Sequence, residues 1–230
     1  MSSVEPPVFH SGSLSYTADF SEPAFELMHA GPVLQRHVFL ALRDFEIDPA
    51  LMQEIATPIG PSYWNLSAGF LGLRASLKLH VGNIQVTFIS DLVRDAALVK
   101  KVLHSIEHAV LQVVPTVSFA QRQIVQQVHC RLSMQGVHER ISPYTGGMTE
   151  ELGIPAGRAA GFYFTSPLFT GEAAVVLDKS AVLDQGLYVE VRCRFHADSF
   201  DLVTSCDNFQ SYLAKVDHAF HLNGTVGEFA

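Results

Sequence analysis

An alternation of hydrophobic and polar residues predicts a β-hairpin in the first half of the chain. Apolar side chains occupy every second position from Leu73 to Val81, and the residues between them are polar. Gly82 and Asn83 follow, and both residue types readily adopt the positive φ angles of a tight hairpin turn. The alternation resumes after the turn and continues to Phe88. A period of two residues is typical of strands that bury one face, so the two segments are predicted to pair.

Six other segments have the composition of strands. Their residues alternate between apolar and polar types, or they are rich in β-branched and aromatic types. The segments are residues 33–47, 117–132, 161–170, 173–177, 187–196 and 200–205. Together with the hairpin they predict that much of the chain is sheet.

Two segments have apolar residues three and four positions apart, which is the spacing of an amphipathic helix. The first lies between Asp95 and Pro115, and the second lies between Asp207 and Gly224. The first helix is predicted to begin at Asp95 or at the residue before it. Asp207 is predicted to be the N-cap of the second, because its carboxylate can accept hydrogen bonds from the first free N–H groups of a helix. A short helix is also predicted over residues 50–56.

These elements predict an α+β fold, in which amphipathic helices pack on one face of one or more antiparallel sheets. Residues 1–32 are rich in Ser, Pro and Gly and are predicted to form an extended arm, and residues 33–230 are predicted to form a single body. Strands followed by a helix occur twice, which suggests two similar β-β-α halves at 33–132 and 160–224. Residues 133–159 contain several Gly and Pro residues and are predicted to be a long connecting loop.

The composition suggests that part of the surface is covered by another protein chain. Charged residues make up 17% of the sequence, against about 25% in a typical globular protein. A surface with few charges is expected to be partly buried against a second copy or another protein. A monomer with a neutral polar surface is the alternative. The formal net charge of −8 argues against a general nucleic-acid binder, because such proteins are usually basic.

The cysteines and the hydropathy pattern bear on the compartment. Cys130, Cys193 and Cys206 are odd in number and none is spaced as C-x-x-C, so neither a disulfide framework nor a zinc ribbon is expected. Three scattered thiols are typical of a reducing cytoplasm. The first residues lack the pattern of a signal peptide, and no apolar run reaches the roughly 18 residues that span a bilayer. We therefore expect a cytoplasmic protein that does not enter the membrane.

One short motif suggests metal chemistry, but its position on the predicted helix argues against it. His104, Glu107 and His108 match the H-x-x-E-H order of some zinc peptidases. Ile106 lies at the centre of the apolar stripe, so both histidines should face solvent on the opposite side. We interpret the motif as a hydrated helix face and expect neither a metal nor a cofactor. The phosphate-binding loop and the nucleophile elbow are also missing from the sequence.

The polar faces of three predicted strands are rich in basic residues. Their outward positions hold fifteen residues, of which eight are Lys, Arg or His and one is acidic. If these faces lie on one side of one sheet, they would form an electropositive surface for an anionic ligand or an acidic partner. Ordinary exposed strands are also polar, and the three strands could face different sides. The predicted binding residues are Arg74, Lys78, His129, Arg131, Arg192, Arg194 and His196.

Two other segments have candidate roles. The predicted loop adds Arg140, Tyr144 and Arg158 as binding residues, because ligand-binding groups are often displayed on loops; a flexible connector is the alternative. In the predicted strand at 161–170, aromatic residues occupy positions that point to both faces of the sheet. We therefore expect Phe162, Tyr163 and their neighbours to be core residues or to lie in an oligomer interface.

The sequence therefore favours a non-catalytic binding or assembly protein that acts through protein–protein contacts, as a homo-oligomer or a subunit of a complex. An acidic protein or an anionic ligand is the expected partner, and nucleic acid is less favoured because few aromatic residues interleave the charges. The alternative is a small-molecule enzyme with an anion-binding pocket of Arg and His residues on the sheet, in which histidine would carry protons. No catalytic residue can be assigned.

Overall fold

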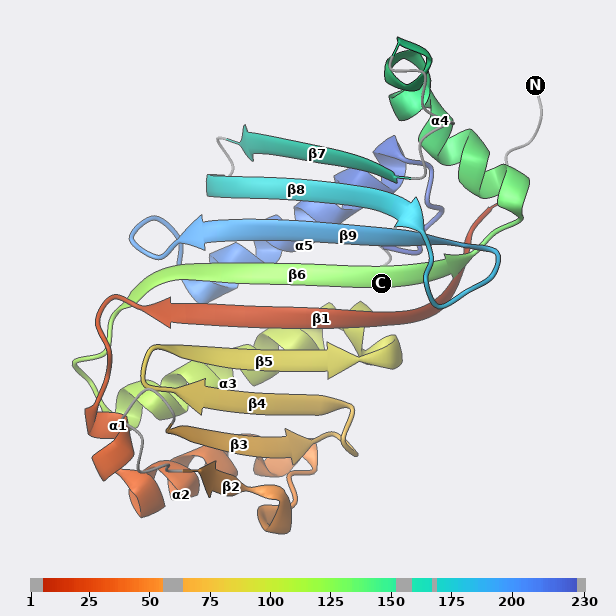
Figure 1. Cartoon of the computed structure of the whole chain (residues 1–230). Helices are drawn as coiled ribbons and strands as arrows, with labels where there is room; N and C mark the ends of the chain where they lie inside the picture. The colour runs from red at the N-terminus through yellow and green to blue at the C-terminus, as the bar shows by residue number, and fades with distance from the viewer. Residues whose placement is uncertain (1–5, 56–63, 152–158, 167–168, 227–230) are drawn as a thin grey trace.

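A computed structural model describes residues 6–55, 64–151, 159–166 and 169–226. Nine strands form one sheet in the order β2-β3-β4-β5-β1-β6-β9-β8-β7, and every neighbouring pair is antiparallel (Figure 1). The predicted α+β class with an antiparallel sheet is confirmed.

The elements follow one another along the chain with short connections. The strands are β1 (Val8–Phe20), β2 (Gln53–Ile55), β3 (Asn65–Phe70), β4 (Ala75–His80), β5 (Asn83–Ile89), β6 (Phe119–Arg131), β7 (Ala159–Ser166), β8 (Phe169–Lys179) and β9 (Gly186–His196). The α-helices are α1 (Glu26–His29), α2 (Gly31–Leu42), α3 (Ala96–Val113), α4 (Met134–Glu151) and α5 (Leu202–Ala219). Among the described helices, none combines the length and the apolar character needed to cross a membrane.

The order of elements repeats. The first half contains β1, α1, α2, β2, β3, β4, β5 and α3, and the second contains β6, α4, β7, β8, β9 and α5, so the two orders match apart from α1 and β2. The strands β1 and β6 pair at the centre of the sheet, and each half then adds its remaining strands outward in reverse chain order. The two halves are thus related by an approximate two-fold symmetry within one sheet. Strand β6 is the first element of the second half.

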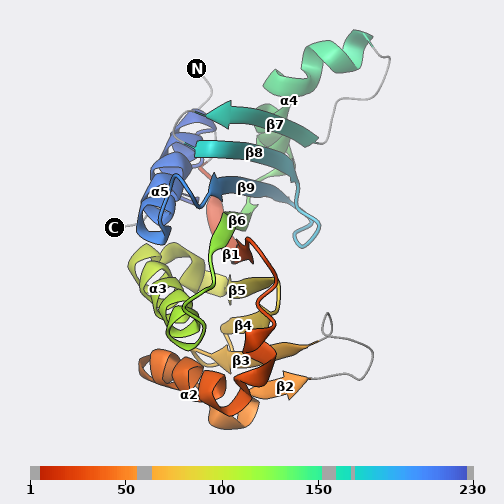
Figure 2. The same ribbon diagram turned by 90° about the vertical axis from the view of Figure 1, so that its left-hand side faces the viewer.

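Helices cover one face of the sheet. Figure 2 shows α2, α3 and α5 along the same side of the strands. Helix α3 buries Val99, Val102, Ile106 and Val110 against the sheet, as its spacing predicted. We call the opposite side of the sheet the open face; its side chains include Ser15 of β1 and those of its register neighbours on the other strands.

The prediction that residues 1–32 form an arm without a regular element is wrong for β1. This strand has neighbours on both sides and lies in the middle of the sheet. Leu14, Tyr16, Ala18 and Phe20 alternate toward the core and are all buried. Ser15, Thr17 and Asp19 occupy the alternate positions, which gives the segment the composition of a linker although its period is that of a strand.

The predicted strand at 33–47 is also wrong, because this segment contains α2. Its buried residues Leu34, Val38 and Leu42 are four positions apart and share one side of a helix. Pro32 occupies the first turn, where the missing N–H costs nothing. The Gly31-Pro32 pair therefore begins a helix instead of ending an arm.

The predicted loop at 133–159 is likewise wrong over most of its length, because α4 occupies residues 134–151. The Ser133 hydroxyl accepts a hydrogen bond from the N–H of Gly136 and caps the start of the helix. Val137 and Ile141 are four residues apart and pack into the core, so tertiary contacts outweigh the poor helix propensity of the glycines and Pro143.

Smaller differences concern where elements begin and end. The β4–β5 hairpin is confirmed, but neither Gly82 nor Asn83 has a positive φ, because the loop spans four residues between the Leu79–Ile84 pair. Residues 202–205 are the first turn of α5 and residues 200 and 201 precede it, so this segment is not a strand. Asp201, not Asp207, caps this helix by accepting a hydrogen bond from the backbone N–H of residue 204. The helix predicted at 50–56 is a 3₁₀ turn (residues 49–51) followed by β2.

A buried ion pair lies between the sheet and α3. The Arg122 guanidinium of β6 donates two hydrogen bonds to the Glu107 carboxylate of α3, over 2.9 and 3.0 Å, and each side chain is 7% exposed. The Tyr16 hydroxyl of β1 donates to the same carboxylate. A further N–H of Arg122 donates to the carbonyl of Phe200, just before α5. Burial, together with the charge of Glu107, raises the pKa of Tyr16 well above its usual value, so the phenol stays protonated as a donor.

We expect Glu107→Ala to lower the free energy of unfolding by about 3–5 kcal/mol, because it leaves the buried Arg122 charge without its partner. Tyr16→Phe should cost about 1 kcal/mol, since the ion pair survives. Urea unfolding measures both values. Lys100→Ala is the matched control. Lys100 is on the same helix as Glu107, and loss of its exposed ion pair with Asp207 of α5 should have little effect. Equal losses for Glu107→Ala and Lys100→Ala would contradict this assignment.

Candidate functional site

The basic residues predicted on strand faces share the open face. The strand register places Lys78 of β4 in line with Gln85, Thr17, Gln123 and finally Arg194 of β9. Because this line crosses four strand spacings of about 4.8 Å, Lys78 and Arg194 lie roughly 19 Å apart. The structure therefore brings these cations onto one surface but not into one pocket.

The open face as a whole is not electropositive, so that prediction is wrong. Strands that the sequence reading did not include contribute carboxylates, from Asp19 of β1 and from Glu172 and Asp178 of β8. With Glu190 there are four acidic residues at outward strand positions, against four Lys and Arg residues. These four basic residues are Lys78, Arg131, Arg192 and Arg194.

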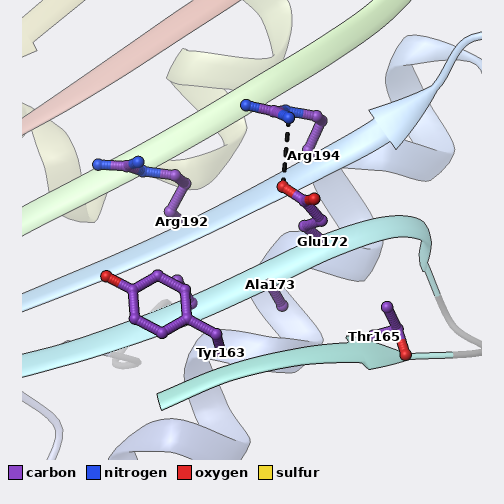
Figure 3. A pocket seen from close by; sticks show the side chains of 7 residues that line it. Tyr163, Thr165, Glu172, Ala173, Arg192 and Arg194 are labelled. Atoms are coloured by element: carbon purple, nitrogen blue, oxygen red, sulfur yellow. Dashed lines mark hydrogen bonds and ion pairs between the residues drawn. The ribbon is translucent and has the colours of Figure 1, made fainter. Parts of the chain in front are cut away.

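A hollow of about 600 Å³ lies on the open face over β7, β8 and β9. The register explains it: Tyr163 of β7, Ala174 of β8 and Arg192 of β9 lie side by side. The small side chain of Ala174 leaves space between two large neighbours. Figure 3 shows the Tyr163 ring lying over β8, with Arg192 and Arg194 extending in one direction from β9.

The adjacent line of side chains closes one end of the hollow. Thr165 pairs with Glu172 across β7 and β8, and the Glu172 carboxylate accepts a hydrogen bond from Arg194 over 3.2 Å. A second N–H of Arg194 donates to the Gln123 side-chain oxygen over 3.3 Å. The Nε of Arg194 is buried without a hydrogen-bond partner among the described residues.

Glu190 is the acceptor that holds Arg192. Its carboxylate accepts hydrogen bonds from Arg192 (2.7 Å), Tyr188 (2.7 Å) and Gln127 (2.9 Å). Burial raises the pKa of Glu190, but the hydrogen bonds from Gln127 and Tyr188 and the charge of Arg192 outweigh burial and lower it overall. The Arg192 side chain is still 46% exposed and uses one of its five N–H donors in this contact. The remaining donors are available to a ligand.

His129 lies outside this hollow. Its Nδ1 is 2.9 Å from the Ser180 hydroxyl, and its ring packs against Tyr188 with 5.1 Å between ring centroids. Ser180 accepts hydrogen bonds from the N–H groups of residues 182 and 183, so its own proton is directed to His129. Burial and the nearby His10 lower the pKa of His129. Neutral His129 thus stabilises the connection between β8 and β9 through its hydrogen bond with Ser180.

Three other predicted residues lie at the ends of strands. Arg74 precedes β4 and forms an ion pair with Asp91 over 3.4 Å. Arg131 is exposed at the end of β6, and His196 is exposed at the end of β9. None of the three lines the hollow of Tyr163 and Arg192.

The candidates in the predicted loop have different surroundings. Arg140 is buried in α4 and donates hydrogen bonds to the carbonyls of Phe220 and His221, so it stabilises the chain at the end of α5. Tyr144 is 40% exposed and packs edge-on against Phe162 and Phe220. Arg158 lies outside the described residues.

The H-x-x-E-H motif does not assemble a metal site. Glu107 is buried in the ion pair with Arg122, whereas His104 and His108 are exposed on α3 with their rings stacked. Within the described ranges, no group of three or more His, Cys, Asp or Glu side chains could hold a metal ion.

The sequence reading missed three residues of the hollow: Tyr163, Thr165 and Glu172. The expectation that Tyr163 is a core residue is wrong, since the side chain is 79% exposed. Its neighbour Phe162 packs against the core. Positions 161, 163 and 165 hold Gly, Tyr and Thr, which is the parity of an outward face. The adjacent aromatic residues obscured this signal.

We expect His129 to make the protein less stable in mild acid. Its folded pKa is below the ordinary value of 6.5, so the unfolded chain binds a proton more readily as the pH falls below about 6.5, and stability is lost through that window. His129→Asn keeps an acceptor for Ser180 and should flatten the loss. Urea unfolding between about pH 8 and pH 5 measures it. Parallel curves for the two proteins across the acidic range would contradict the assignment.

Comparisons with known proteins add no second source of information on this site. A scan against protein-family models gave no match to the chain, and a search of curated proteins gave none either. The function is therefore inferred from the chemistry of the open face.

Proposed function

We propose that this chain is a non-catalytic binding protein that works in an oligomer or a larger complex and recognises an acidic segment of a protein partner. The open face is the proposed contact surface, and the hollow between Tyr163 and Arg192 is its centre. The observation that carries the proposal is a large aromatic ring, 79% exposed, beside two arginines on the same face.

Tyrosine and arginine are the residue types that supply much of the binding energy in protein interfaces. Tyr163 offers a flat apolar surface with a polar end, and it loses little conformational freedom on binding. Arg192 offers N–H donors in the planar arrangement that matches a carboxylate. A side chain of Asp or Glu that enters over Ala174 would meet both groups.

The balanced charge of the open face limits how such a partner is recognised. Glu190 and Glu172 already neutralise the two arginines of the hollow. A partner carboxylate therefore gains from direct hydrogen bonds at short range and less from long-range attraction. We expect binding that weakens moderately with salt, since exposed charges are screened beyond about 8–10 Å at physiological ionic strength.

A small anionic molecule is the second candidate for the same hollow. Its volume of about 600 Å³ is within the roughly 300–1,000 Å³ typical of small-molecule sites. An enzyme is less well supported. Among the described residues, those lining the hollow include no histidine, and His129, one of the proposed proton carriers, is engaged by Ser180.

The proposed compartment is the cytoplasm. The support is that Cys130, Cys193 and Cys206 are all buried free thiols. Burial raises the pKa of Cys130 to about 11 and that of Cys206 to about 12. Such thiols are inert and act as small apolar side chains, as in a reducing environment.

We expect Tyr163→Ala and Arg192→Ala each to weaken capture of the partner by about 30-fold or more, because truncating a central Tyr or Arg typically costs about 2 kcal/mol. The immobilised protein would be exposed to lysate of the cells that make it, with chemical cross-linking and mass spectrometry to identify the bound chain and its contact residues. Cross-links from acidic residues of the partner to the open face are expected.

His104→Ala is the control for this experiment, because His104 is exposed on α3 on the other side of the molecule. It should capture the same protein as the wild type. Equal capture by the wild type, Tyr163→Ala, Arg192→Ala and His104→Ala would rule out the open face as the binding surface.

The second candidate has its own test. If the hollow holds a small anion, a native mass spectrum of the purified protein should contain the 25.2 kDa chain with a defined extra mass. Arg192→Ala should lose that mass, whereas Lys78→Ala, on the same face but distant from the hollow, should keep it. A spectrum with no added mass would argue against this candidate.

A further inference from the structure

Strand β7 is an edge without the usual protection against strand pairing. It lies at one end of the sheet and pairs only with β8 among the described strands. Its eight residues, Ala159–Ser166, contain no charged residue and no proline. One edge of such a strand presents backbone N–H and C=O groups that can pair with another strand.

The opposite edge of the sheet is protected. Strand β2 has only three residues, and Glu54 stands at its centre. The Glu54 carboxylate accepts hydrogen bonds from the Trp64 indole and the Gln35 amide, so its charge is held at this edge. Short length and an edge charge are two of the devices that prevent unwanted pairing. The two edges of one sheet therefore differ in the way expected if only β7 meets another strand.

We propose that a second copy of this chain pairs with β7, so that two sheets join into one. Antiparallel pairing of a strand with its own copy is two-fold symmetric, which is the commonest symmetry of soluble homodimers. Since the strand is uncharged, two copies do not repel each other along it. In an antiparallel ladder, opposite residues point to the same side. The helices of both copies would then lie on one side and the two open faces on the other.

Aromatic side chains flank this edge on both sides of the sheet. Tyr163 is 79% exposed on the open face. On the helical side, Tyr144, Phe162 and Phe220 form a cluster with ring centroids 5.2–5.5 Å apart, and Tyr144 is 40% exposed. A second copy that pairs with β7 would cover part of both surfaces, and apolar burial would add to the backbone hydrogen bonds. Figure 1 shows α4 beside the start of β7 and the rest of the strand clear of the described helices.

This inference deepens the proposed function, because it gives the expected oligomer a surface. It rests on the oligomeric part of that proposal and not on the acidic partner, which is expected to contact Arg192 as well as Tyr163. The low charge content of 17%, which favours a surface covered by another chain, is consistent with it.

The test compares Gly161→Lys with Gly161→Ala in the full chain. Gly161 is exposed on β7, and an added Cβ would make only an ordinary 3.5 Å contact with the Tyr163 ring, so both variants should fold. An edge lysine opposes strand addition. We expect the wild type and Gly161→Ala to be dimers of the 25.2 kDa chain by analytical ultracentrifugation at micromolar concentration. Gly161→Lys should have a dissociation constant at least about tenfold higher.

Hydrogen exchange of the β7 amides provides a second readout. These amides should exchange more slowly as wild-type protein concentration rises, and Ala159→Lys, a second edge variant, should abolish that dependence. A wild type that stays monomeric, or a dimer that both lysine variants leave unchanged, would overturn the proposal. Ala159→Lys, four residues from Tyr163 along β7, should still capture an Arg192-dependent partner, and Arg192→Ala should still dimerise, so that failure of either proposal can be told from failure of the other.

Discussion

The structure depends most on one buried ion pair, between Glu107 and Arg122. It lies where the two halves meet, because Arg122 is on the first strand of the second half and Glu107 is on the last helix of the first half. Tyr16, on the first strand of the first half, donates a hydrogen bond to the same carboxylate. A charge in this position must be matched by specific donors, since the interior solvates it poorly. The pair therefore fixes how β1, β6 and α3 align more strictly than apolar packing alone would.

That alignment determines what the other side of the sheet can display. When β1 and β6 are held in register, their outward serine, threonine and glutamine residues form a mostly neutral strip across the centre of the open face, with Asp19 at one end and His129 and Arg131 at the other. The arginines and carboxylates of β8 and β9 lie to one side of this strip, next to the unprotected edge of β7. The proposed partner site and the proposed dimer edge are thus both in the second half. In the first half, by contrast, the described edge strand β2 has only three residues and carries Glu54 at its centre.

The fold class, the β4–β5 hairpin and helix α3 could be predicted because their signals are local. The central strand β1 could not, since its small polar residues become a strand only between β5 and β6, far away in the sequence. In α2, Val38 and Leu42 fit both a period of two and a period of four, and no local signal distinguishes a strand from a helix there. Arg192 and Arg194 were predicted as binding residues only because they occupy alternate, outward positions of a predicted strand. The hollow beside them depends on Ala174 lying opposite Tyr163, which is a matter of register.

The central position of β1 has a consequence for how the protein is made. Strand β1 is synthesised well before its partner β6, which follows about a hundred residues later; Ser13, for example, is hydrogen-bonded to Gln127. Until β6 has been synthesised, one side of β1 has no strand to pair with. Such non-local pairing is slow and exposes unpaired strands during folding. The serine-rich, weakly hydrophobic character of β1 that hides it in the sequence also lowers the tendency of this unpaired strand to aggregate before β6 is made.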